Sequence, residues 1–156
     1  MKLTKNQITK MIISTVFILL VAILGSVFVN LGMDWFNSLD KPSQWIPNIV
    51  IPIVWTIIYI SFGIINYLWL RKSNIPTNVV VLMFINGILN VVWCLVFFTL
   101  NLTFIGNIVI ILNLIFGYLL LGEIFKYEKI YGLILSIYPI WLSIATTLNT
   151  ALWILN

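Results

Sequence analysis

The sequence predicts an all-α integral membrane protein: one domain, residues 1–156, built as a bundle of five transmembrane helices with a long loop between helices 1 and 2. Of its 156 residues, 62% are hydrophobic and 8% are charged, a composition far too apolar for a water-soluble domain. A helix needs about 20 apolar residues to cross roughly 30 Å of hydrocarbon. Five runs have this length: residues 11–29, 48–70, 78–100, 103–125 and 130–155.

The first run, residues 11–29, follows three lysines and therefore has the beginning of a secretory signal. It is longer than a usual signal core, and no small-x-small cleavage site follows it. We expect it to be a retained helix.

The connector after this helix, residues 30–47, contains the segment DWFNSLDKPSQWIP, which is rich in tryptophan, proline and charge. The other links, RKSNIPT, NL and KYEK, are short, so sequential helices should be antiparallel neighbours. Pro52, near the start of the second helix, and Pro139, inside the fifth, each lack a backbone donor and are expected to bend their helices.

The distribution of basic residues predicts the orientation in the membrane. The five predicted spans place seven of the eight basic residues on one side of the membrane: Lys2, Lys5, Lys10, Arg71, Lys72, Lys126 and Lys129. The other side carries only Lys41. Because short cytoplasmic loops retain positive charge, we expect a cytoplasmic N-terminus, with the 30–47 loop and the C-terminus outside. The low charge and the abundance of Asn, Ile and Lys are typical of a protein of a bacterial cell membrane. The net charge of +4 reflects this orientation, and no nucleic-acid partner is expected.

The sequence lacks the residues that most catalytic and metal sites need. Histidine is absent, and the four acids lie in or beside loops: Asp34, Asp40, Glu123 and Glu128. A proton relay or an ion pathway normally needs ionisable groups inside the bundle. Hydrolytic triads and paired carboxylates are missing too, and the single Cys94 allows no intramolecular disulfide. We expect Cys94 to be a packing residue, and we expect neither a metal nor a cofactor.

Aromatic and amide side chains recur at helical spacing on three predicted helices. They are Trp55, Tyr59, Gly63 and Asn66 on the second, Asn90, Trp93 and Phe97 on the third, and Trp141, Ala145 and Asn149 on the fifth. Any one stripe is compatible with ordinary packing, and the tryptophans near helix ends with an interfacial belt. Together, the three stripes indicate a pocket with flat apolar walls and a few hydrogen-bonding groups, suited to a bulky planar hydrophobic ligand.

The segments WFNSLDKPSQWIP, IVWTIIY, NVVWCLVFF and WLSIATTLN resemble the translocator protein family, also called tryptophan-rich sensory proteins or peripheral benzodiazepine receptors. The resemblance covers essentially the whole chain. It implies a five-helix bundle, often a homodimer, whose first loop folds over an inter-helix pocket. The implied ligands are porphyrins, notably protoporphyrin IX, and benzodiazepine-type and isoquinoline compounds.

The resemblance also implies roles for particular residues. Trp55, Asn90, Trp93, Trp141 and Ala145 occupy family motif positions and are expected to bind ligand, together with Tyr59, Phe97 and Asn149 from the same stripes. The loop is expected to act as a lid shaped by Trp35 and by the turn at Pro42, with Pro47 starting the second helix.

Sensing, sequestration or transport of the ligand is the leading function. One alternative is a light-dependent porphyrin-degrading enzyme in which Trp55 and Trp141 donate electrons. The other is a small transporter of amphipathic solutes, although no inverted repeat is evident.

The chain also departs from the family pattern. Gln44 stands at the family's aromatic position, with a tryptophan one place later at Trp45, and Ile46 replaces the first of two paired prolines. Cys94 replaces a serine, and an acid often found in the fourth helix has no counterpart, Asn107 being the nearest polar residue. The C-terminal segment lacks the tyrosine and basic residue of the animal sterol-recognition motif, so sterol is not expected to be the native ligand. Three small residues favour close approach of helices: Ala22, Ser26 and Gly87. The expectation of a homodimer rests on the family resemblance.

Overall fold

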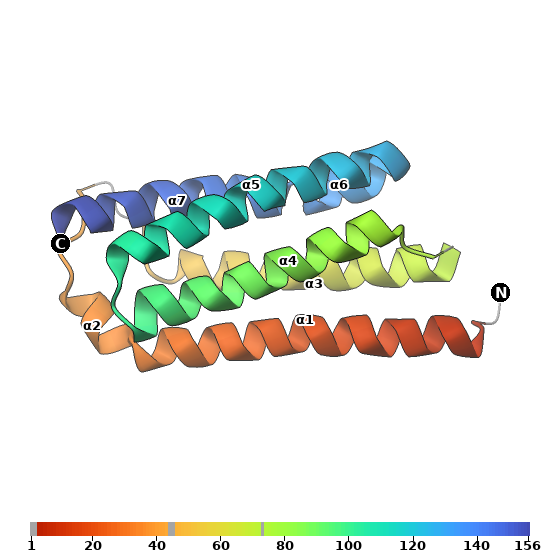
Figure 1. The fold of residues 1–156 in the computed structure, drawn as a ribbon, viewed down its shortest axis with the longest axis horizontal. Helices are drawn as coiled ribbons and strands as arrows, with labels where there is room; N and C mark the ends of the chain where they lie inside the picture. The colour runs from red at the N-terminus through yellow and green to blue at the C-terminus, as the bar shows by residue number, and fades with distance from the viewer. Residues whose placement is uncertain (1–2, 44–45, 73) are drawn as a thin grey trace.

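The computed structural model describes residues 3–43, 46–72 and 74–156 and confirms the predicted helical membrane bundle (Figure 1). Five helical stretches in these ranges are long and apolar enough to cross a membrane. They are α1 (Lys5–Leu31), α3 (Val50–Lys72), α4 (Thr77–Cys94) with a π-helical turn at Leu95–Thr99, α5 (Thr103–Tyr127), and α6 (Lys129–Leu135) with α7 (Ile137–Leu155). The short α2 (Met33–Ser38) lies within the long connector.

The helices form a bundle with α1 along one edge, α5 and α6–α7 along the opposite edge, and α3 and α4 between them (Figure 1). Helix α1 packs against α3 and α4, while α5 packs against α4 and α7. Large apolar side chains are exposed on all the long helices, as expected where the surrounding solvent is lipid.

Helix α1 begins at Lys5, earlier than the apolar run alone indicates. Thr4 forms a capping box with Gln7: the Gln7 backbone N–H donates to Thr4 Oγ1 (3.2 Å), and the Thr4 N–H donates to Gln7 Oε1 (2.9 Å). This reciprocal cap satisfies backbone donors that a helix start leaves without partners.

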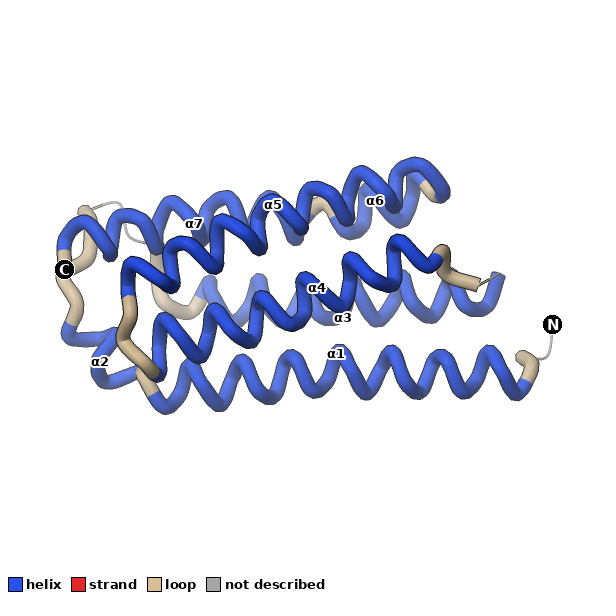
Figure 2. The backbone as a smooth tube through the Cα atoms, in the orientation of Figure 1, coloured by secondary structure: helices blue, strands red, loops and turns tan. Residues whose placement is uncertain are grey.

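The prolines affect their helices differently. The last span is interrupted between Leu135 and Ile137, because Pro139 has no N–H to donate to the Leu135 carbonyl (Figure 2). Pro52 is the third residue of α3, where no intrahelical acceptor exists, and α3 continues without a break to Lys72. Helix α3 starts at Val50 and not at Pro47, whose carbonyl accepts a hydrogen bond from the Val50 N–H (2.9 Å).

The described basic residues gather at one end of the bundle, except for Lys41. Lys10 Nζ donates to Asn74 Oδ1 (2.7 Å), which ties the start of α1 to the α3–α4 link. Lys72, at the end of α3, pairs with Glu128 in the α5–α6 link. The charge asymmetry read from the sequence thus corresponds to two ends of the folded bundle, with α2 and the C-terminus at the other end (Figure 1).

Candidate functional site

A cavity of about 640 Å³ lies between α1, α3 and α4, with α2 at its end. Its volume is within the range typical of sites for small organic molecules. Its aromatic walls come from all of these elements except α1: Phe36, Trp55, Tyr59, Trp93 and Phe98. The polar groups along it are few and uncharged: Ser26, Asn30, Asn48, Thr56 and Asn90.

One wall of this cavity is a continuous aromatic surface. The Trp55 ring stacks on Tyr59 with centroids 5.8 Å apart and on Trp93 at 6.4 Å, both at an interplanar angle of 29°. Trp55 and Tyr59 are four residues apart on α3 and therefore lie on one face of the helix. The result is an aromatic wall of three closely spaced rings, tilted 29° from one to the next, which offers π-contacts to a planar ligand.

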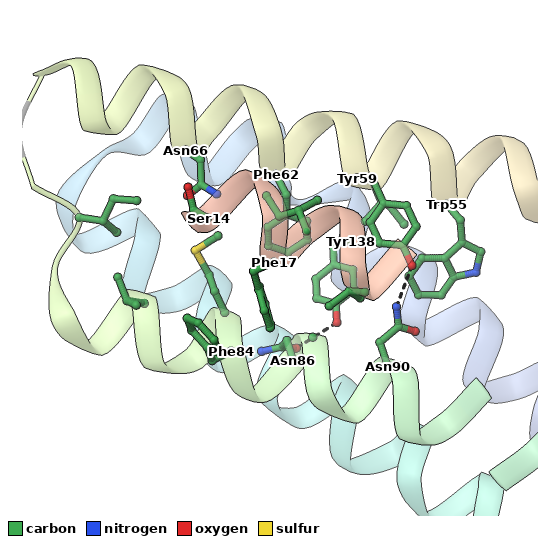
Figure 3. Close-up of a pocket in the computed structure, with 17 residues that line it drawn as sticks. Ser14, Phe17, Trp55, Tyr59, Phe62, Asn66, Phe84, Asn86, Asn90 and Tyr138 are labelled. Carbon is green, nitrogen blue, oxygen red and sulfur yellow. Dashed lines mark hydrogen bonds between the residues drawn. The ribbon is translucent and has the colours of Figure 1, made fainter. Parts of the chain in front are cut away.

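Asn90 supplies the central hydrogen-bonding group. Its Nδ2 donates to Tyr59 Oη (3.0 Å), which joins α4 to α3 (Figure 3). The Asn90 side chain is buried, and its Oδ1 has no partner among the described residues. An acceptor is thus left available beside the aromatic wall.

On the side of Trp93 that faces away from the cavity, its indole N–H takes part in a buried polar network with α5 and α7. Its Nε1 donates to Asn149 Oδ1 on α7 (3.1 Å), and Asn149 Nδ2 donates to Asn107 Oδ1 on α5 (3.5 Å). Thr150 Oγ1 also donates to Asn107 Oδ1 (2.8 Å). Asn107, the polar residue nearest the position where the family often has an acid, is therefore a neutral acceptor in a network that orients an indole of the cavity.

The structure brings four of the ten predicted site residues to this cavity: Trp55, Tyr59, Asn90 and Trp93. Phe97 and Ala145 belong to the core cluster beside it, where Phe97 is 1% exposed. Asn149 lies behind Trp93. Trp141 packs in a second cluster with Ile58 and Leu142, and its Nε1 has no partner among the described residues.

The two predicted lid residues also lie outside the cavity lining. Trp35 of α2 packs edge-on against Phe97, with ring centroids 5.5 Å apart, while Pro42 follows α2 in the loop. Helix α2 contributes Met33 and Phe36 to the cavity instead.

Sequence reasoning missed the contribution of α1. Ala22, Gly25 and Ser26 line the cavity. The sequence pattern predicts only that Ala22 and Ser26 favour close packing of helices. A Cβ at Gly25 would lie 3.5 Å from Cys94 Sγ and 3.8 Å from Tyr59 Oη, so this small residue leaves space beside both. The spacing of three small residues on one helical face was the signal available in the sequence. Cys94 lines the same cavity, and Gly87 accommodates Phe17 of α1.

The connector is tied down at the end of the cavity. Lys41 Nζ donates to the Phe36 carbonyl at the end of α2 (3.0 Å) and lies 5.0 Å from the centre of the Phe36 ring. The Asp40 N–H donates to Asn156 Oδ1 (3.0 Å), and Asn156 Nδ2 donates to the Asp40 carbonyl (3.1 Å). The loop is thereby joined to the C-terminus of α7.

The approach of the connector to the π-helical turn after α4 requires a glycine at position 32. A Cβ on Gly32 would lie 1.9 Å from the Phe98 carbonyl oxygen. The departures at Gln44 and Trp45 lie outside the described residues, whereas Ile46 packs against the core cluster that contains Trp141.

The chain is similar to one protein family over most of its length and to several individual proteins of known sequence. A sequence model of the TspO/MBR family matches residues 14–154. A "Tryptophan-rich protein TspO" from Archaeoglobus fulgidus is 29% identical over 152 residues, covering 96% of this chain and 99% of that protein. Another from Chlorobaculum tepidum is 32% identical over 144 residues, covering 88% and 90%. "Protein CrtK" of Rhodobacter capsulatus is 29% identical over 126 residues, covering 78% of each chain.

Proposed function

Because this integral membrane protein belongs to the TspO/MBR family, we propose that it binds protoporphyrin IX or a similar bulky planar hydrophobic molecule, for sensing, sequestration or transport. The observation that supports the proposal is the cavity of about 640 Å³, with its stacked Trp55, Tyr59 and Trp93 wall. A flat π-system gains both dispersion and burial of apolar area against such a wall.

The polar groups of the cavity favour a ligand that is largely uncharged where it is enclosed. The described residues that line the cavity include amides and hydroxyls but no lysine, arginine or acid. Burying an ionised group among them would be costly because no opposite charge is at hand. The ionised propionates of a porphyrin should therefore lie at the cavity mouth, with the macrocycle against the aromatic wall.

The connector is the lid of this site in our proposal. Phe36 of α2 lines the cavity, and the contacts of Lys41 and Asn156 hold the segment around α2 in place. Entry of a ligand then requires α2 and the loop after it to move away from the ends of α1 and α4.

We further propose that the bundle lies in a bacterial cell membrane with its basic end in the cytoplasm. The lysine and arginine distribution supports this orientation. The cavity and its lid would then be nearer the outer face. A homodimer remains a proposal from family membership.

A dark titration of the detergent-solubilised protein with protoporphyrin IX tests the binding. The readouts are tryptophan quenching and the shift of the porphyrin absorption band, the second of which does not depend on the indoles that a variant removes. We expect saturable binding that is weakened about tenfold or more in Trp55→Ala and Asn90→Ala. Trp153→Phe is the matched control, because Trp153 is exposed and packs against Phe104 away from the cavity. Non-saturating signals in the unaltered protein would overturn the proposal.

Illumination of the saturated complex separates binding from the enzymatic alternative. Reversible spectral change is the expected result for a binding protein. Loss of the porphyrin band with a defined new product would instead support light-dependent degradation, for which the stacked Trp55 and Trp93 offer adjacent indoles.

A further inference from the structure

A second, smaller cavity of about 80 Å³ lies next to the first, between α1, α3 and α4 (Figure 3). Its walls are mainly aromatic and aliphatic, and no lining residue among those described is charged. It is nonetheless large enough for several atoms of a ligand or for a few water molecules.

Asn66 of α3 is the unusual member of this lining. The residue is 3% exposed, and both Oδ1 and Nδ2 lack partners among the described residues. Figure 3 shows its amide on the cavity side of α3, near Ser14 of α1. A buried amide with neither its donor nor its acceptor satisfied is costly, so a partner is expected to enter the cavity.

The two cavities share three lining residues: Trp55, Tyr59 and Asn90. Two of these shared residues are joined by a neutral hydrogen bond, from Asn90 Nδ2 to Tyr59 Oη. A ligand that occupies both cavities must pass the Asn90 side chain, whose Oδ1 has no partner among the described residues. Asn66 is two helical turns beyond Tyr59 on α3, about 10 Å along the axis.

We propose that the smaller cavity is a polar subsite of the ligand site, which takes a neutral hydrogen-bonding group on an arm of an otherwise flat apolar ligand. Asn66 would pair with the end of the arm, and Asn90 with an amide partway along it. An ionised carboxylate is disfavoured because no charged side chain is found among the described lining residues. Water is the neutral partner that the arm would replace.

Two probes of equal shape test this subsite. Each is a protoporphyrin IX mono-amide, one carrying an N-(3-hydroxypropyl) arm and the other an N-butyl arm, so that a terminal hydroxyl is exchanged for a methyl group. The unaltered protein should bind the hydroxyl probe about fivefold or more tightly than the butyl probe. In Asn66→Leu, whose side chain has the same number and branching of heavy atoms and no polar atom, the preference should vanish or reverse.

Ser61→Ala is the matched control for this experiment. Ser61 is buried on the same helix and lines neither cavity, since its Oγ donates to the Ile57 carbonyl (2.8 Å). This variant should keep the preference for the hydroxyl probe. Equal affinity of both probes for the unaltered protein, or a preference that survives Asn66→Leu, would overturn the subsite.

The subsite rests on the proposed function, and the same probes distinguish the two failures. If neither porphyrin binds, the ligand class itself is wrong. If both bind with equal affinity, the larger cavity holds the macrocycle and the smaller one has no part in recognition. The comparison in the unaltered protein needs no variant, so a folding defect in Asn66→Leu would not leave the proposal untested.

Discussion

Trp93 Nε1 on α4 donates a hydrogen bond to Asn149 Oδ1 on α7 at 3.1 Å, and this bond links the aromatic wall of the cavity to the far side of the bundle. Both residues are buried, so neither has water as an alternative partner in the membrane interior. The orientation of an indole at the cavity surface thus depends on an amide that does not itself line the cavity.

We expect Asn149→Ala to lower both stability and affinity. The change leaves the Trp93 N–H without its acceptor, at a cost of about 1–2 kcal/mol for a buried donor in a helical bundle. Thermal unfolding in detergent measures the first effect, and porphyrin titration the second. Thr147→Ala on the same helix is the control, because Thr147 is exposed and bonds only to the Ile144 carbonyl. An unchanged unfolding temperature in Asn149→Ala would show that the bond contributes nothing.

Trp141→Phe should leave porphyrin affinity within about twofold of the unaltered protein. The residue is implied by family resemblance to bind ligand, but it packs in the core cluster with Ile58 and Leu142 and does not line the larger cavity. Its N–H has no partner among the described residues, so phenylalanine removes no recorded hydrogen bond. A loss of affinity comparable to that of Trp55→Ala would move the ligand site towards α7.

Gly25→Val should weaken porphyrin binding by about tenfold or more, because the added side chain fills space between α1 and the aromatic wall. Its Cβ would make only ordinary contact with Cys94 Sγ, at 3.5 Å, so the bundle should still form. Gly63→Val is the control: a Cβ there meets nothing within 4 Å, and the residue lines neither cavity. Equal affinities for the two variants would argue against a ligand lying beside α1.

Asn156→Ala should speed ligand release several-fold in stopped-flow dissociation. The change removes both hydrogen bonds that join Asp40 of the connector to the end of α7, so the proposed lid opens more often. Leu155→Ala serves as the control, because Leu155 is an exposed neighbour. Identical release rates for the two variants would mean that the loop does not limit the exit of the ligand.

The number of spans, their order and the gathering of basic residues at one end followed from the sequence alone. These are local properties: the length and hydropathy of a run decide whether it crosses a bilayer, and charges cannot readily lie within it. The segments around Trp55 and Trp93 also identified the family, and the structure brings both indoles to one cavity.

The tertiary structure alone decided which face of each helix meets the cavity. In a soluble protein a polar face marks the outside, but here large apolar side chains face both the lipid and the core. Hydropathy therefore constrains the rotation of each helix about its axis only through a few buried amides, such as Asn90 and Asn149, and these do not say which core-facing residues meet the cavity. The stripe of Trp141, Ala145 and Asn149 therefore lies behind the wall, while Ala22, Gly25 and Ser26 of α1 line the cavity. Small residues leave that space because α1 packs beside α3 and α4, a relationship that only the assembled bundle contains.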